Sequence, residues 1–184
     1  MRYHRSDVVD RALAVLDEYG LESLTMRRLA TELGVQPSAL YHHVPNKQTL
    51  LAAVADEILA RGRRPRRART WDRRVVELCG ELRDAMLAYR DGAEVVATAQ
   101  SFGLGAGDLA AALREALRDG GLPDELVDVA TRTLLHLVFG HTAEEQTALQ
   151  AASAGAIDGE PARSSDFERS LEIVLDGLRT RVRS

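Results

Sequence analysis

The sequence predicts an all-α fold in two parts. Apolar residues recur at the three- and four-residue spacing of amphipathic helices, and no segment sustains the alternation that a half-buried strand requires. Capping residues and glycines separate these segments at helix-length intervals. An arginine-rich run, RGRRPRRAR at residues 61–69, is interrupted by Gly62 and Pro65 and divides the chain. We therefore expect one helical part at residues 1–62 and a larger one at residues 63–184.

The smaller part holds four predicted helices. Three of them have a good N-cap, at Ser6, Thr25 and Asn46, and the first two end at Gly20 and Gly34. The third begins with a proline, which suits the first turn of a helix. The four helices are expected over residues 6–19, 26–33, 37–43 and 47–61.

The larger part is predicted to hold five more helices, of which the last two carry extended apolar faces. The five are expected over residues 70–90, 93–102, 108–118, 123–150 and from about 165 onward. The helix at 123–150 is apolar nearly all round, and the last one repeats apolar residues at 4-3-4 spacing, namely Phe167, Leu171, Val174 and Leu178. Both look like halves of a four-helix homodimer interface. The alternative is that both pack only within one chain.

Composition and motifs argue against several classes of protein. There is no stretch of 18 or more uncharged apolar residues, and the first residues, MRYHRSDVVDRAL, are charged where a signal peptide needs an apolar run. We expect a cytoplasmic protein with no membrane partner. The single Cys79 excludes an internal disulfide and a cysteine zinc site, and we expect it to be buried. Because a Gly-rich phosphate loop, HExxH and GxSxG are all absent, we expect neither enzymatic activity nor a cofactor.

The net charge of −4 hides an asymmetry along the chain. Residues 1–69 hold twelve Arg or Lys against eight Asp or Glu, whereas residues 70–184 hold twelve against twenty. The N-terminal part is therefore the basic one, as a nucleic-acid partner requires. The arginines between residues 61 and 69 are either a solvated surface or direct phosphate contacts, and the sequence leaves both interpretations open.

The segment LTMRRLATELGVQPSALYHHV, residues 24–44, has the proportions of a helix-turn-helix, with a short glycine-containing turn between two helices. In the second helix Leu40 and Val44 share one side and are expected to pack inward. The opposite side carries small and hydrogen-bonding side chains: Ser38, Ala39 and His42, flanked by Tyr41 and His43. Such a face suits entry into the major groove of DNA.

Two cations flank this face. Arg27 points outward near the start of the preceding helix, whereas Arg28 can pair with Glu32 at i+4 and is expected to be structural. Lys47 follows the Asn46 cap, where a cation opposes the helix dipole by a few tenths of a kcal/mol to about 1 kcal/mol. That placement makes sense if a phosphate is bound there by the lysine and the free N–H groups together.

The histidines do not predict a metal site. His42 and His43 are successive helix residues that diverge by about 100°, so they cannot chelate one ion. His141 and Glu144 are neighbours at i+3, and such a pair more often forms a satisfied buried hydrogen bond than a ligand site. We therefore expect no metal.

Residues 24–51, LTMRRLATELGVQPSALYHHVPNKQTLL, resemble the DNA-binding module of the tetracycline-repressor family of bacterial regulators, because the LT…LA…LGV…LY.HV.NK..LL framework is intact. YRDGAEV at 89–95, the Gly-Leu break at 121–122 and FGHTAEEQ at 139–146 resemble the family's regulatory domain. The resemblance is strong up to residue 60 and looser beyond it. It implies an N-terminal three-helix helix-turn-helix DNA-binding module joined to a larger helical ligand-binding and dimerisation domain.

The resemblance also implies a function and a set of contacts. The expected function is a ligand-responsive transcriptional regulator, most readily a repressor, that binds a palindromic double-stranded DNA operator as a homodimer and is released by a small-molecule effector. Repression and activation are not distinguished, and an architectural or activating DNA-binding protein without an inducer is the alternative. The implied base contacts are Arg27, Pro37, Ser38, Ala39 and His42, and the implied phosphate contacts are Thr25, Tyr41, His43 and Lys47.

The matched ligand pocket departs from the family's metal-chelating form. The position of a metal-chelating histidine holds Val96, and positions of polar pocket contacts hold Leu78 and Arg63. We therefore expect a largely apolar effector with one or two polar anchors and no metal. The expected ligand-binding residues are Leu78, Leu82, Val96, Gln100, Leu109, Leu113, His136 and Glu144.

Overall fold

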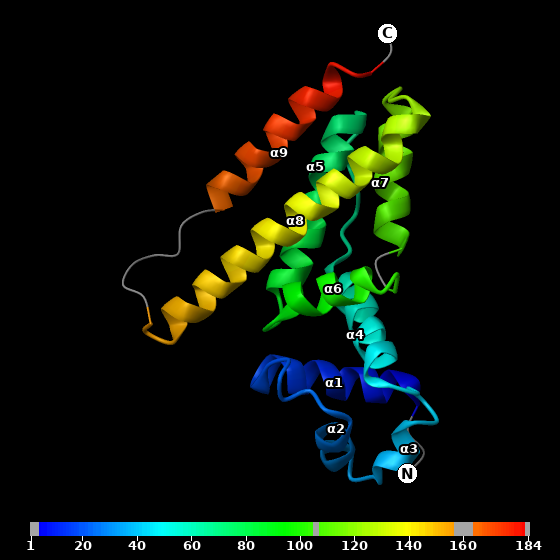
Figure 1. The fold of residues 1–184 in the computed structure, drawn as a ribbon, viewed down its shortest axis with the longest axis vertical. Helices are drawn as coiled ribbons and strands as arrows, with labels where there is room; N and C mark the ends of the chain where they lie inside the picture. Colours follow the sequence, from blue (N-terminus) through cyan, green and yellow to red (C-terminus); the bar gives the residue numbers. More distant parts are fainter. Residues whose placement is uncertain (1–3, 105–106, 157–163, 183–184) are drawn as a thin grey trace. The chain divides into compact units, whose positions relative to one another are not determined.

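A computed structural model describes residues 4–104, 107–156 and 164–182 of the chain, and within them it contains α-helices and no strand. The all-α prediction is confirmed. The helices form two compact units (Figure 1): Met1–Gly62 with Ala85–Ala106, and Arg63–Asp84 with Gly107–Ser184. No helix in the described ranges combines the length and the apolar character that a membrane span requires. The assignment of residues 1–62 to DNA and 63–184 to ligand and dimer contacts stays a prediction.

The first unit is a helical module with one apolar core. It consists of α1 (Arg5–Tyr19), α2 (Met26–Leu33), α3 (Pro37–Leu40), α4 (Lys47–Gly62) and α6 (Gly92–Ser101). Its largest fully buried side chains are Leu16, Leu24, Leu29, Leu40, Leu50, Ile58 and Met86. Burial of a leucine or isoleucine contributes about 1.5–3 kcal/mol each. This core holds the short helices α2, α3 and α6 in place, because helices of that length have little stability alone.

Among the helix boundaries of this unit that differ from prediction, the start of α1 and the end of α3 have a clear local cause. Helix α1 begins at Arg5, one residue before the predicted cap Ser6, because the carboxylate of Asp7 accepts the backbone N–H of His4 at 2.7 Å. Helix α3 ends at Leu40 instead of His43. Pro45 disfavours helical backbone at the residue before it, so the chain leaves the helix through a turn at residues 41–43.

Helix α6 belongs to the first unit because the chain returns close to α4. A Cβ at Gly62 would lie 2.4 Å from the Cβ of Ala85, and a Cβ at Gly92 would lie 2.3 Å from the carbonyl oxygen of Met86. Only glycine permits both approaches. The end of α4 and the start of α6 are thereby packed against the same stretch of backbone.

The second unit is built around the long helix α8. It contains most of α5 (Trp71–Leu87), together with α7 (Gly107–Asp119), α8 (Asp124–Ser153) and α9 (Ser164–Arg179). Figure 1 shows α9 returning alongside α8. Buried side chains of its core include Val75, Leu78, Leu82, Leu113, Leu117, Leu134, Val138, Leu171 and Leu175. Cys79 is buried as predicted, and its burial raises the pKa of the thiol to about 12.

The apolar seam of α9 packs inside its own chain. Phe167 and Leu171 are buried, whereas Ile173, outside the predicted seam, is 74% exposed. The 4-3-4 pattern therefore identified a buried face correctly: Phe167 and Leu171 are covered within their own chain, whereas Val174 and Leu178 are half-buried. The ring of Phe167 meets His141 of α8 edge-to-face, with 5.3 Å between centroids.

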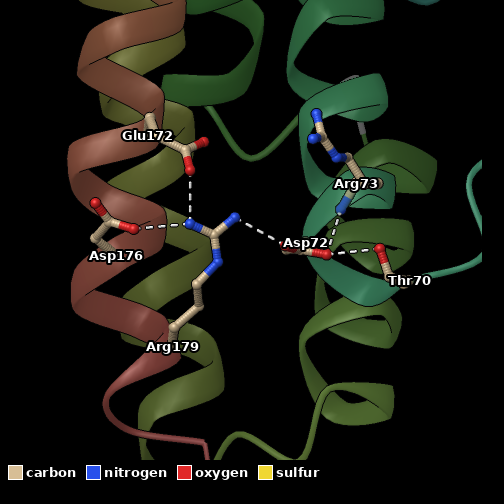
Figure 2. Close-up of polar contacts among 6 residues, drawn as sticks. All are labelled: Thr70, Asp72, Arg73, Glu172, Asp176 and Arg179. Carbon is tan, nitrogen blue, oxygen red and sulfur yellow. Dashed lines mark hydrogen bonds and ion pairs between the residues drawn. The ribbon is translucent and has the colours of Figure 1, made fainter.

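An arginine at the end of α9 ties it to the start of α5 (Figure 2). Arg179 donates to Glu172 at 2.6 Å, to Asp176 at 2.7 Å and, across 107 residues, to Asp72 at 2.8 Å. Asp72 also accepts the hydroxyl of Thr70 at 2.6 Å. The hydrogen bonds from Thr70 and then Arg179 lower the pKa of Asp72 to about 2. The C-terminal helix is thus held by charge-assisted hydrogen bonds as well as by its apolar seam.

Asp72→Asn should lower the free energy of unfolding at pH 7 by about 1–2 kcal/mol, because the tie to Arg179 loses its charge. The folded-state pKa lies below the ordinary value of 3.8, so the carboxylate stabilises the fold above about pH 4 and that contribution disappears as the pH falls towards 2. Denaturant unfolding of both proteins at several pH values should show the difference shrinking on acidification. Asp128→Asn is the control, since its pair with Arg114 is exposed. An equal loss at pH 7 and pH 2.5 would contradict the assignment.

Candidate nucleic-acid interface

The turn between α2 and α3 is fixed by its caps. The hydroxyl of Thr25 accepts the backbone N–H of Arg28 at 3.1 Å, as predicted for an N-cap. At the other end Gly34 has φ 66°, in the left-handed region, and the N–H of Val35 returns to the carbonyl of Ala30 at 3.0 Å. This is the C-terminal arrangement that glycine favours. It sets the direction in which α3 leaves α2.

Helix α3 has one anchored side and one open side. Leu40 and Val44 are 2% and 0% exposed, respectively. The opposite side is open: Ser38, Ala39, Tyr41 and His42 are exposed, and Pro37 and His43 are half-buried. The predicted division into an inward apolar edge and an outward hydrogen-bonding edge is confirmed. The individual base and phosphate contacts stay predictions.

The N-terminus of α4 carries the second part of the interface. The side-chain oxygen of Asn46 accepts the N–H of Thr49 at 2.8 Å, which confirms the predicted cap, and Lys47 is exposed in the first turn. Such an end combines free N–H groups with a cation and is suited to bind a phosphate.

Two neighbouring arginines on α2 have different surroundings. Arg27 is exposed. Arg28 lies over the ring of Tyr19, 3.6 Å from its centroid, and approaches Glu32 at 3.9 Å. The predicted contrast between an outward Arg27 and a structural Arg28 is confirmed.

Half of the arginine run at 61–69 is engaged in ion pairs. Arg61 contacts both Asp10 and Glu57, Arg63 lies 2.7 Å from Asp108, and Arg64 lies 2.9 Å from Asp84. The backbone that follows them is held as well, because the carboxylate of Glu77 accepts the N–H groups of residues 67 and 68. The run is therefore an ordered segment with Arg66, Arg67 and Arg69 exposed.

The predicted effector residues differ in burial. In the second unit Leu78, Leu82, Leu109 and Leu113 are buried, and in the first unit Val96 is buried. Gln100 is half-buried, and its Oε1 is shielded from water without a hydrogen-bond partner. The two expected polar anchors, His136 and Glu144, are exposed on α8. Their ligand role stays a prediction.

The expected hydrogen bond between His141 and Glu144 is not formed. Glu144 is exposed, and Nδ1 of His141 is buried without a partner. The neighbouring carboxylate, Glu145, instead pairs with Arg83 of α5, whose Nε donates to it at 2.8 Å. Spacing at i+3 allowed the contact, but the two side chains project from α8 in different directions. Among the described residues, no group of three or more His, Cys, Asp or Glu side chains is arranged to hold a metal ion.

Sequence reasoning missed a contact between α1 and the start of α6. Asp91 has φ 55°, in the left-handed region, and its carboxylate accepts the backbone N–H of Leu21 at 2.7 Å. The neighbouring N–H of Arg90 donates to Asp17 at 3.2 Å. We call these two contacts the α1–α6 latch. The only signal in the sequence is an Asp-Gly pair at a helix end, which does not name a partner 70 residues away.

A compact helix-turn-helix with a free recognition face defines a DNA-binding regulator, and comparison with known proteins gives the family. A model of bacterial regulatory proteins of the tetR family matches residues 8–54, and a model of tetracyclin repressor-like C-terminal domains matches residues 64–165. The chain belongs to the tetracycline-repressor family.

Individual relatives match over different lengths. The class A tetracycline repressor from transposon 1721 of Escherichia coli is 32% identical over 194 residues, covering 95% of this chain and 89% of that protein. A stretch aligned over 97 residues is 43% identical to the class D repressor of Escherichia coli, and it covers 51% of this chain and 44% of that repressor.

Two similar solved structures contain bound molecules. BioQ with its double-stranded DNA operator is 39% identical, with a TM-score of 0.86, covering 97% of this chain and 99% of that one. A TetR variant from Acinetobacter baumannii AYE in complex with minocycline is 30% identical, with a TM-score of 0.80, covering 99% of this chain and 96% of that one.

Lys47→Ala should weaken operator binding equally for all DNA sequences and reduce the slope of log affinity against log salt by about 1, because one phosphate contact is lost. His42→Ala should instead change base preference, by about 1–3 kcal/mol at one position. Fluorescence anisotropy with operator duplexes at several salt concentrations measures both. Gln48→Ala, at an exposed neighbouring position, is the control. Unchanged affinity and salt slope for Lys47→Ala would contradict the phosphate assignment.

Proposed function

We propose that the protein is a homodimeric transcriptional repressor of the tetracycline-repressor family, which a small, largely apolar effector releases from a palindromic operator. The observation that carries the proposal is the exposed edge of α3, which presents Ser38, Ala39 and His42 while Leu40 and Val44 anchor it. The operator-bound BioQ structure supports it. We expect the protein to act in the cytoplasm and to have no enzymatic activity of its own.

The DNA contacts divide into two kinds. Arg27, Pro37 and the exposed edge of α3 read base edges in the major groove, while Thr25, Tyr41, His43 and Lys47 bind phosphates and fix the register. Tyr41, with half its surface exposed, offers a hydroxyl at the edge of the helix. The phosphate contacts supply affinity, and the base contacts supply the choice of operator.

The dimer interface is proposed on the outward faces of α8 and α9. The exposed face of α8 carries uncharged residues at 4-3-4-3 spacing, namely Val129, Thr133, His136, Gly140 and Ala143. On α9 the exposed Ile173 lies one turn before Gly177, which has nothing within 4 Å of an added Cβ. Small and apolar side chains at this spacing let two helix pairs approach closely. A two-fold dimer would place two recognition helices about 34 Å apart, one turn of DNA.

The effector site is proposed to be apolar. Of the residues expected to bind the effector, Leu78, Leu82, Leu109 and Leu113 of the second unit are buried, and so is Val96 of the first. Aliphatic side chains offer no ligands for a metal chelate, so an uncomplexed organic molecule is the better fit. The minocycline complex of the relative supports a small molecule as the signal.

The α1–α6 latch is the proposed route from effector to DNA. It joins α1, which packs against α2 and α4, to the two residues before α6. Arg61 of α4 is hydrogen-bonded to Glu57 and to Tyr89, and these bonds raise its pKa. An effector that prefers a different arrangement of α6 would move α1 with it, and its leverage equals its difference in affinity for the two states.

Selection from a random duplex library should return a palindrome with half-site centres about 10 base pairs apart, because two identical heads bind one face of the helix. Ile173→Glu should be monomeric in sedimentation and lose operator binding, since each interface would bury two unpaired carboxylates. Its circular dichroism should stay helical. An asymmetric single site bound with equal affinity by Ile173→Glu would contradict the dimer.

Asp91→Asn should loosen the latch, because a neutral oxygen accepts the N–H of Leu21 less strongly than a carboxylate. The amide of Leu21 should then exchange about tenfold faster with solvent deuterium. Operator affinity should change uniformly across DNA sequences, because the side chains of α3 that face the bases are unchanged. Glu22→Gln, exposed beside the latch, is the control. Altered base preference with unchanged exchange at Leu21 would contradict this role.

A further inference from the structure

One threonine of α8 lacks the hydrogen bond that its neighbours make. The hydroxyls of Thr131, Thr133 and Thr147 each donate to the carbonyl four residues earlier, at 2.8–2.9 Å. The hydroxyl of Thr142 has no partner, although its side chain is 0% exposed and its Oγ1 is shielded from water. Thr142 alone among these four therefore directs a polar atom into the interior without satisfying it.

A second unpartnered polar atom lies on the adjacent residue. Nδ1 of His141 is buried without a hydrogen bond, and its ring packs on Phe167 of α9. Buried polar groups are almost always paired, so two unpaired ones on successive residues need an explanation. A buried polar atom without a partner lowers the stability of the fold. Thr142 lies on a buried face of α8, with Val138 one turn before it and Gln146 one turn after it.

The charge of Arg83, which lies beside the same Phe167 ring as His141, is already paired. Arg83 donates to Glu145 through Nε at 2.8 Å and also through Nη2, and its Nη1 donates to Asp84 at 3.1 Å. Its guanidinium also lies 5.4 Å from the centroid of the Phe167 ring. Because this cation is already neutralised, it has no charge to offer an anionic ligand.

We propose that Thr142, with His141 beside it, is the polar anchor of the effector site, and that the effector is an uncharged, mainly apolar molecule carrying one hydroxyl or carbonyl oxygen. This inference rests on the proposed function. In it, Thr142 and His141 take the place of the exposed His136 and Glu144 as the polar contacts of the effector. A hydroxyl can donate or accept, so either oxygen function satisfies it. A carboxylate is disfavoured because Arg83 is already paired with Glu145 and Asp84, and a plain hydrocarbon would leave Thr142 unpaired.

The first test is the stability of the ligand-free protein. Thr142→Val keeps the shape of the side chain and removes the unpaired hydroxyl, so its melting temperature should rise by roughly 2–4 °C. Thr131→Val is the matched control, because Thr131 is equally buried on the same helix but its hydroxyl is bonded to the carbonyl of Val127. That variant should melt at or below the wild-type temperature. A Thr142→Val protein that melts lower than wild type would overturn the proposal.

The second test compares three probes of one shape: 1-naphthol, naphthalene and 1-naphthoate. Calorimetric titration of the full-length protein should show 1-naphthol binding about fivefold or more tightly than naphthalene, and 1-naphthoate binding weakest. In Thr142→Val the preference for 1-naphthol should disappear, while Thr131→Val should retain it. Equal binding of the three probes, preference for the naphthoate, no binding of any probe, or an unchanged preference in Thr142→Val would each overturn it.

The outcome is separable from that of the proposed function. Operator binding by the wild-type protein is measured separately from the binding of the three probes. If the probes fail while the operator is bound, only the anchor is wrong. If the probes discriminate but no palindromic DNA is bound, the proposed repressor function is wrong and the ligand site stands.

Discussion

The burial of Leu40 and Val44 is the constraint on which DNA recognition depends. A helix of four residues cannot hold itself together, because nucleation costs more than so few hydrogen bonds return. Its orientation comes from the left-handed turn at Gly34 on one side and from these two apolar anchors on the other. Only when that edge is fixed does the opposite edge become a rigid surface for bases. The short helix therefore owes its conformation to its neighbours, and the specificity that we expect of it does not require much stability of its own.

Local chemistry explains which parts of the fold could be predicted from the sequence. The caps Thr25 and Asn46 and the stop at Gly34 depend on residues within a few positions, and the structure confirms them. The faces of α3 follow from helical periodicity in the same way. Features that depend on tertiary partners were beyond that reasoning. The seam of α9 was recognised as buried, but periodicity does not say whether its own chain or another covers it, and Phe167 and Leu171 are covered by their own.

The α1–α6 latch shows why coupling is harder to predict than folding. A left-handed aspartate before a glycine reads locally as a helix junction, and its role emerges only when the N–H of Leu21 meets its carboxylate. One charge-assisted bond of this kind is worth about 1.5–3 kcal/mol, comparable with typical coupling energies between allosteric sites. We propose that this bond, between the loop that follows α1 and the residue before α6, couples effector binding to the position of the recognition module.

The unpaired hydroxyl of Thr142 lowers the stability of the ligand-free protein, and effector binding would explain why it is there. Stability alone would favour valine at position 142. It would also favour a threonine rotamer whose hydroxyl donates to the preceding turn, as those of Thr131 and Thr147 do, whereas the hydroxyl of Thr142 has no partner. A protein that must respond to a ligand gains from leaving one polar atom unsatisfied, because the ligand then recovers energy that the empty protein cannot. Arg83 is already paired with Glu145 and Asp84, so its charge does not favour an anionic effector over an uncharged one. The proposed DNA and effector sites therefore share one principle: apolar anchors fix a helix so that a few polar atoms can face the partner.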